Sequence, residues 1–223
     1  MTRSGESVRL VVTPVIIPST AKSSIPSAAD LAIFESVVTV FTIPLDVLVD
    51  HAPDNMLYTL HELSSSLTLQ EVPSYPNGTS QILANVSTTP PDLPQGSSFA
   101  AAEILIPKPT AEYPTQYIYT SNRNFGVKDP RGDTIAIFEN VDNQLVLRNQ
   151  VYTGLDQIRG MMSGEQAGNG ADAYIAAGAD SGTGGVKVFK RSEGGANLEE
   201  VAANTVVPTR DTFVWLSQDQ MLR

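Results

Sequence analysis

Four charged side chains that could carry chemistry lie in or beside strand-like stretches of the sequence: Glu62, Glu103, Arg123 and Arg159. A guanidinium binds a carboxylate through a bidentate fork, and a glutamate transfers a proton when its carboxyl is held near a reacting atom. Side chains of these types can hold an anionic group and move a proton, provided that the fold brings them to one place. The alternative is structural, with Glu62 and Arg123 forming a salt bridge between neighbouring sheets.

Other reactive groups are few. The chain has two histidines and no cysteine, which excludes disulfides, thiolate catalysis and cysteine metal sites and argues against a histidine-rich metal site. We therefore predict no metal site. An imidazole is a natural general base, but His61 alternates with Glu62 along a strand, so His61 is expected to pack toward a neighbouring strand. His51 lies in a loop-like sequence and is expected to be solvated.

Two further motifs have structural explanations. Arg131-Gly132-Asp133 matches an adhesion tripeptide, but we expect a hairpin turn in which Gly132 adopts a positive φ and Asp133 caps the loop. Residues 178–185 are rich in glycine, but no helix is predicted to follow them, so we do not expect a phosphate site.

The elements that would position these groups form a repeat. Three hairpin patterns recur in residues 56–71, 117–139 and 172–190, each with two strand-like runs around a polar turn. The hairpins start 61 and 55 residues apart. This is the spacing of about 45–55 residues typical of four-stranded propeller blades, lengthened by loop insertions. Long helical patterns are absent, and 16 glycines and 15 prolines suit many short strands and turns. The sequence therefore predicts an all-β protein, a β-propeller whose inner strands line a central channel. Residues near the ends of inner strands face the mouth of the channel, and we expect Glu62, Glu103, Arg123 and Arg159 to be such residues.

The rest of the chain is assigned around these hairpins. Inner strands are predicted at residues 99–106 and 158–162, outer strands at 145–152 and 198–202, and a last strand at 212–216. The polar, proline-rich stretch 73–96 is expected to be a surface insertion. Residues 1–50 lack the repeat and are predicted to be a separate, divergent segment, with the blades in residues 51–223. No apolar run is long enough to span a membrane.

Five segments spread over residues 50–217 carry a family resemblance: Leu57-Tyr-Thr-Leu-His-Glu-Leu63, Phe99-Ala-Ala-Ala-Glu-Ile104, Ser121-Asn-Arg123 with residues 129–139, residues 149–161, and residues 208–216. They resemble the fungal carboxymuconate cyclase-like proteins of the lactonase group, seven-bladed propellers that also include 6-phosphogluconolactonase-type enzymes. The family's Gly-Pro-Arg-His motif is replaced here by Phe41-Thr-Ile-Pro-Leu-Asp46. With 223 residues, the chain is expected to supply about three to four blades, the C-terminal part of a propeller.

The resemblance implies an isomerase or lactonase that closes or opens a lactone ring on a polycarboxylate, without a metal or an organic cofactor. Arg123 and Arg159 would hold carboxylates, and Glu62 or Glu103 would move the proton or orient an arginine. Three alternatives stay open: an enzyme inactive through truncation, a non-catalytic binding module, and a fragment that does not fold stably alone.

Partners and location are predicted from charge and motifs. The net charge of −10 argues against nucleic-acid binding, and self-association is expected through the open edges of the blades. The chain start does not match a signal peptide, which favours a cytoplasmic location. The N-glycosylation sequons at Asn77 and Asn85 make secretion or the cell surface the alternative.

Overall fold

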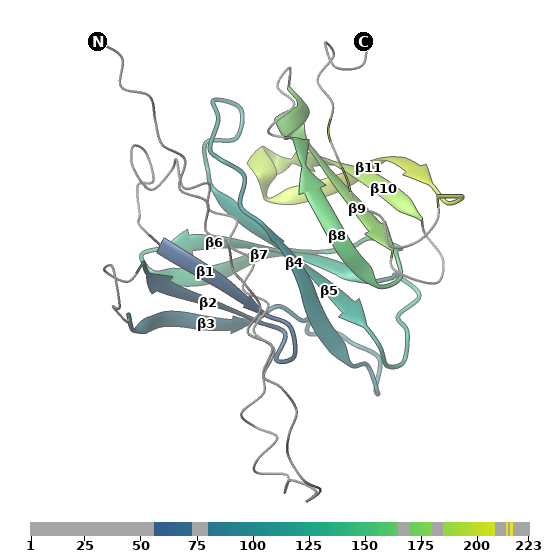
Figure 1. The fold of residues 1–223 in the computed structure, drawn as a ribbon, viewed down its shortest axis with the longest axis horizontal. Helices are drawn as coiled ribbons and strands as arrows, with labels where there is room; N and C mark the ends of the chain where they lie inside the picture. Colours follow the sequence, from purple (N-terminus) through teal and green to yellow (C-terminus); the bar gives the residue numbers. More distant parts are fainter. Residues whose placement is uncertain are drawn as a thin grey trace, which may run out of the picture. The chain divides into compact units, whose positions relative to one another are not determined.

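The computed structural model describes residues 56–72, 80–164, 170–179, 185–207, 213 and 215. All of them belong to one compact unit, Ser36–Arg223. The described residues form eleven strands and two short 3₁₀ helices, arranged in three antiparallel sheets (Figure 1). This confirms the prediction of an all-β protein. Among the described residues, no helix is long and apolar enough to cross a membrane.

Each sheet is a meander in which sequence neighbours are also spatial neighbours. The first sheet contains β1 (Met56–His61), β2 (Ser66–Glu71) and β3 (Ile82–Ser87). The second contains β4 (Phe99–Leu105), β5 (Tyr117–Asn124), β6 (Thr134–Val141) and β7 (Gln144–Tyr152). The third contains β8 (Ile158–Ser163), β9 (Tyr174–Ala179), β10 (Val186–Ser192) and β11 (Asn197–Asn204). The 3₁₀ helices are η3 (Ala171–Ala173) and η4 (Glu193–Gly195).

The three predicted hairpins are present as β1–β2, β5–β6 and β9–β10. The predicted outer strands are β7 and β11, each at the edge of its sheet. The glycine-rich segment leads into strand β10 and not into a helix. Residues 1–50, His51 and Asn77 lie outside the described residues, as does most of the predicted strand at 212–216.

The proline-rich part of the predicted insertion, residues 90–94, is an irregular loop as expected, but residues 82–87 of the same stretch form β3, a strand that was not predicted. β3 pairs with β2 alone and forms the edge of the first sheet. Its only fully buried residue is Ala84, whereas Asn85 and Ser87 are exposed. An edge strand needs one neighbour and little burial, so its sequence carries a weak strand pattern.

Two hydrophobic cores lie on opposite faces of the second sheet. Successive side chains of a strand point to opposite faces, so β5 contributes Ile118 to the core shared with the first sheet and Tyr119 to the core shared with the third. Every residue of β5 is buried. Face-to-face packing of consecutive meanders is the arrangement of propeller blades.

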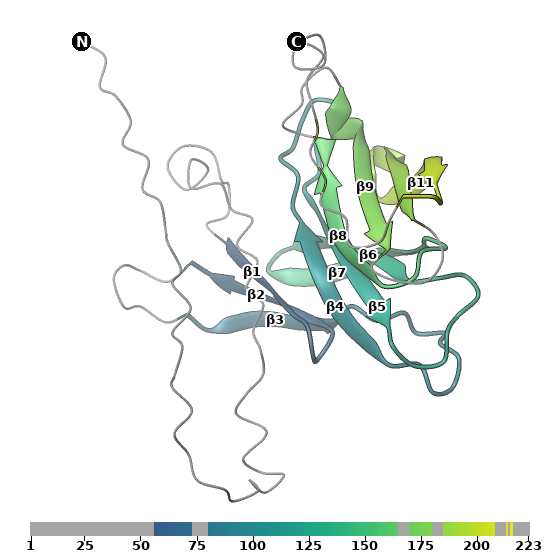
Figure 2. The same ribbon diagram turned by 45° about the vertical axis from the view of Figure 1, so that its right-hand side comes forward.

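The first and last strands of the sheets occupy two different regions. β4 and β8, the first strands of the second and third sheets, lie side by side (Figures 1 and 2). Among the outer strands, β7 contacts both β3 and β11. β4 and β8 approach each other more closely than the outer strands do, as strands near the axis of a propeller must, so β4 and β8 are the inner strands. The hairpin β1–β2 corresponds to the hairpin β5–β6 of the second sheet, so β1 is the equivalent of β5 and not of an inner strand.

Candidate functional site

Glu103 lies on the inner strand β4, at a β-bulge. Ala101 pairs with Asn122 and Ile104 pairs with Thr120, so two residues of β4 oppose one residue of β5. The Glu103 N–H donates a hydrogen bond to Ser121 Oγ at 3.0 Å. Bulges redirect side chains, and this one sets the position of Glu103 on the strand.

The electrostatic environment of Glu103 suits proton transfer. Burial raises the pKa of its carboxyl to about 7, and a hydrogen bond from the Ile104 N–H opposes this effect. Near neutral pH both the acid and its conjugate base are then populated, which is the condition for a general acid or base. Perturbed carboxyls of this kind are concentrated at functional sites.

Arg159 lies on the other inner strand, β8, and also at a bulge. Ile158 pairs with Ala179 and Gly160 pairs with Gly178, which leaves Arg159 without a cross-strand partner. Its side chain is exposed, and it forms no ion pair with another described residue. Such a guanidinium is available to a carboxylate from solution.

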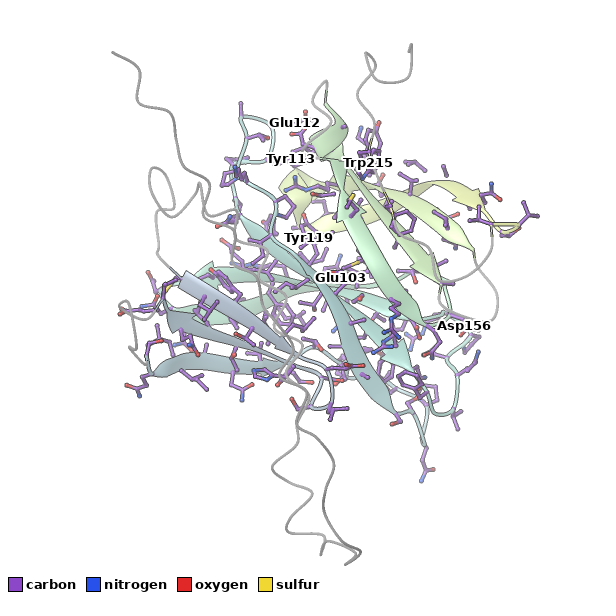
Figure 3. All side chains as sticks on the ribbon, viewed as in Figure 1. Glu103, Glu112, Tyr113, Tyr119, Asp156 and Trp215 are labelled. Carbon is purple, nitrogen blue, oxygen red and sulfur yellow. The ribbon has the colours of Figure 1, made fainter. Side chains whose placement is uncertain are left out.

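The strands that carry these two predicted residues, β4 and β8, lie side by side. Figure 3 shows Glu103 on β4 where β8 runs beside it. The Ser121 hydroxyl lies between the two strands, because it also donates to the Ile158 carbonyl at 3.5 Å. Glu103 and Arg159 do not form an ion pair, and no cation contributes to the pKa of Glu103.

The other two predicted residues, Glu62 and Arg123, form an ion pair with each other. The expectation that they lie on inner strands is wrong: Glu62 is in the turn after β1, and Arg123 is on β5, the second strand of its sheet. The Arg123 side chain is 6% exposed, and its guanidinium also donates to the Ala101 carbonyl at 3.4 Å. The Ala101 N–H in turn donates to the Glu62 carbonyl at 3.1 Å. These contacts join the first and second sheets, as the structural alternative predicted.

The remaining sequence candidates have structural contacts. His61 packs toward the neighbouring strand, as expected, with its Nε2 3.0 Å from Thr68 Oγ1. Gly132 has the predicted positive φ of 83°. Arg131 is held by Asp129 and stacks 3.8 Å from the centre of the Tyr152 ring, so the tripeptide 131–133 is not presented as an adhesion motif.

Asp133, which was expected to cap the loop, also joins two sheets. The Asp133 carboxylate accepts the Asn124 N–H at 3.0 Å and the Ile158 N–H, on β8, at 3.1 Å. It therefore ties the second sheet to the inner strand of the third. Burial raises its pKa to about 6. The described residues contain no cluster of side chains able to hold a metal ion.

Comparison with known proteins identifies the family. Residues 48–215 match the family model "Lactonase, 7-bladed beta-propeller". A protein from Lactobacillus plantarum superposes with a TM-score of 0.53 at 21% identity, over 69% of this chain and 39% of that one. The periplasmic gluconolactonase of Pseudomonas aeruginosa does so with a TM-score of 0.50 at 14% identity, over 70% and 38%.

These structural likenesses show the fold, and the chain spans about two fifths of the length of both proteins. No curated protein matches the chain. The family match covers most of the sequence and includes both inner strands described above. The chain therefore belongs to the lactonase family of seven-bladed β-propellers.

Proposed function

We propose that the chain acts on a lactone ring in a carboxylate-bearing small molecule, with Glu103 as the proton-transfer group. The observation that carries this proposal is a half-buried glutamate on an inner strand with a pKa raised to about 7. The family relationship and the gluconolactonase among its structural neighbours support the choice of a lactone. Arg159, exposed on the adjacent inner strand, would hold the substrate carboxylate.

In the ring-opening direction, the Glu103 carboxylate takes a proton from water as the water oxygen adds to the acyl carbon. The ring C–O bond then breaks, and the departing oxygen takes the proton back from Glu103, which gives a hydroxy acid. In the closing direction that a carboxymuconate cyclase-like activity requires, a substrate carboxylate oxygen adds to a double bond. The Glu103 carboxyl then gives its proton to the adjacent carbon.

The test is turnover by the purified chain on δ-gluconolactone, 6-phosphogluconolactone and 3-carboxymuconate. Hydrolysis is followed with a pH indicator and cyclisation by loss of the conjugated chromophore. Glu103→Gln should lower kcat by about 100-fold or more, since general acid–base groups contribute 10²–10⁴-fold. On 3-carboxymuconate, Arg159→Gln should raise KM, whereas Arg148→Gln, a change to an arginine on the outer strand β7, should not. On δ-gluconolactone, which has no carboxylate, neither variant should change KM. Turnover that survives Glu103→Gln would refute the assignment.

A non-catalytic binding module, secreted or on the cell surface, is the second candidate. One specific observation favours it: Asn85 of the Asn85-Val-Ser87 sequon is exposed on the edge strand β3. Secretion of the chain from a eukaryotic host should then add a glycan that Asn85→Gln removes, measured by intact mass with and without a glycosidase. An unmodified mass would leave this candidate without support.

A further inference from the structure

Ser121 occupies the position opposite the β4 bulge and is completely buried. Its Oγ accepts a hydrogen bond from the Glu103 N–H at 3.0 Å and donates to the Ile158 carbonyl at 3.5 Å. A hydroxyl has one proton to give and two lone pairs to receive, so one side chain can make both bonds. The two contacts lie on different sheets.

Both contacts are next to a bulge. Glu103 is one of the two β4 residues that oppose Ser121, and Ile158 immediately precedes the bulged Arg159 of β8. A bulge disrupts the regular ladder of backbone hydrogen bonds, so its backbone groups need other partners. Ser121 supplies one to each strand, the one to β8 at a long 3.5 Å, and it thereby links the strands that carry both proposed functional side chains.

We propose that Ser121 is a positioning residue, whose hydroxyl holds the β4 bulge in the form that presents Glu103 half-buried beside β8. The effect of Ser121 on catalysis rests on the proposed function, whereas its effect on the position of Glu103 does not. Without the hydroxyl, the Glu103 amide loses its acceptor and the bulge relaxes. The carboxyl then moves toward water and away from the place where it would meet a substrate.

The principal variants are Ser121→Ala, which deletes the hydroxyl, and Ser121→Cys, which keeps a similar volume but offers only a weak acceptor. Thr120→Val is the matched control: Thr120 is the adjacent residue of β5, equally buried, and its hydroxyl has no hydrogen-bond partner among the described residues. Both serine variants should lower kcat by about 10- to 100-fold with little change in KM, since small misplacements of catalytic groups have effects of this size. The control should match the wild type.

A second readout does not depend on turnover. The titration of the Glu103 carboxyl is followed by ¹³C NMR on glutamate-labelled protein, with the resonance assigned by its loss in Glu103→Gln. The wild-type midpoint should lie near 7. In Ser121→Ala and Ser121→Cys it should move toward the ordinary value near 4.5, because the carboxyl gains solvent.

The outcomes separate the two proposals. A wild type that turns over no lactone, with a midpoint that shifts in the serine variants, refutes the proposed function and supports the positioning role. An active wild type whose kcat and midpoint are unchanged in Ser121→Cys refutes the positioning role. If Ser121→Ala does not fold, Ser121→Cys decides the question, because it preserves the packing volume of the buried site.

Discussion

Replacement of Glu103 by glutamine is expected to stabilise the folded chain at alkaline pH. Burial raises the pKa of this carboxyl from the ordinary 4.5 to about 7. Between these pH values the native state keeps a proton that the unfolded chain releases. The free energy of unfolding therefore falls as pH rises from about 4.5 to 7. Glutamine carries no charge at any pH, so the variant avoids this loss.

The size of the effect follows from the shift. One pKa unit corresponds to about 1.4 kcal/mol, so the full shift sets an upper limit of about 3.5 kcal/mol. Solvent screens a half-buried carboxylate in part, which lowers the expected gain to the order of 1–2 kcal/mol at pH 8. Near pH 4.5 the native carboxyl is already neutral, and the gain should be close to zero.

The assay is urea unfolding followed by circular dichroism at pH 4.5, 6 and 8, for the wild type and Glu103→Gln. Asp133 titrates in the same range, so only the difference between the two proteins isolates Glu103. Glu199→Gln is the control, because Glu199 is exposed on the outer strand β11. A gain that is equal at all three pH values, or that matches the control, would refute burial as the cause of the shift.

Three further predictions concern the contacts between sheets and are checked by urea unfolding. Asp133→Asn should cost about 1–3 kcal/mol, because the amide replaces a carboxylate oxygen that accepts a backbone N–H; an unchanged midpoint would contradict this. Gly195→Ala should cost about 1–3 kcal/mol, since φ is +104° and a Cβ would lie 3.0 Å from the Tyr119 hydroxyl; a neutral effect would show that the turn adapts. A double-mutant cycle of Glu62→Gln and Arg123→Met should give a coupling of about 1–3 kcal/mol, and additive effects would rule out a stabilising ion pair.

Local patterns were sufficient to predict much of the fold. The hairpins β1–β2, β5–β6 and β9–β10 were predictable because each combines strand-forming residues with a polar or glycine-containing turn, and repetition strengthened the assignment. β3 was missed because an exposed edge strand has little alternation. The alternation of side chains along a strand also predicted correctly that His61 packs toward a neighbouring strand, which is β2.

The candidate site was less predictable, because it depends on register. Glu103 and Arg159 were selected from the sequence, but the bulges at which they lie arise from pairing with distant strands. Ser121 gave no separate signal within Ser121-Asn-Arg123, since its two contacts are to other strands. The sequence allowed Arg123 to bind a substrate carboxylate or to pair with Glu62, and the ion pair between the two residues became visible only in the structure.

The most direct test of the proposed function is the dependence of kcat/KM on pH, measured from pH 5 to 9 on δ-gluconolactone and 3-carboxymuconate. The purified wild type should turn over at least one of them, with a titration limb near pH 7 that disappears, together with most of the rate, in Glu103→Gln. A folded wild type without turnover on either compound, or a limb near pH 7 that persists in Glu103→Gln, would contradict the assignment of Glu103 as the proton-transfer group.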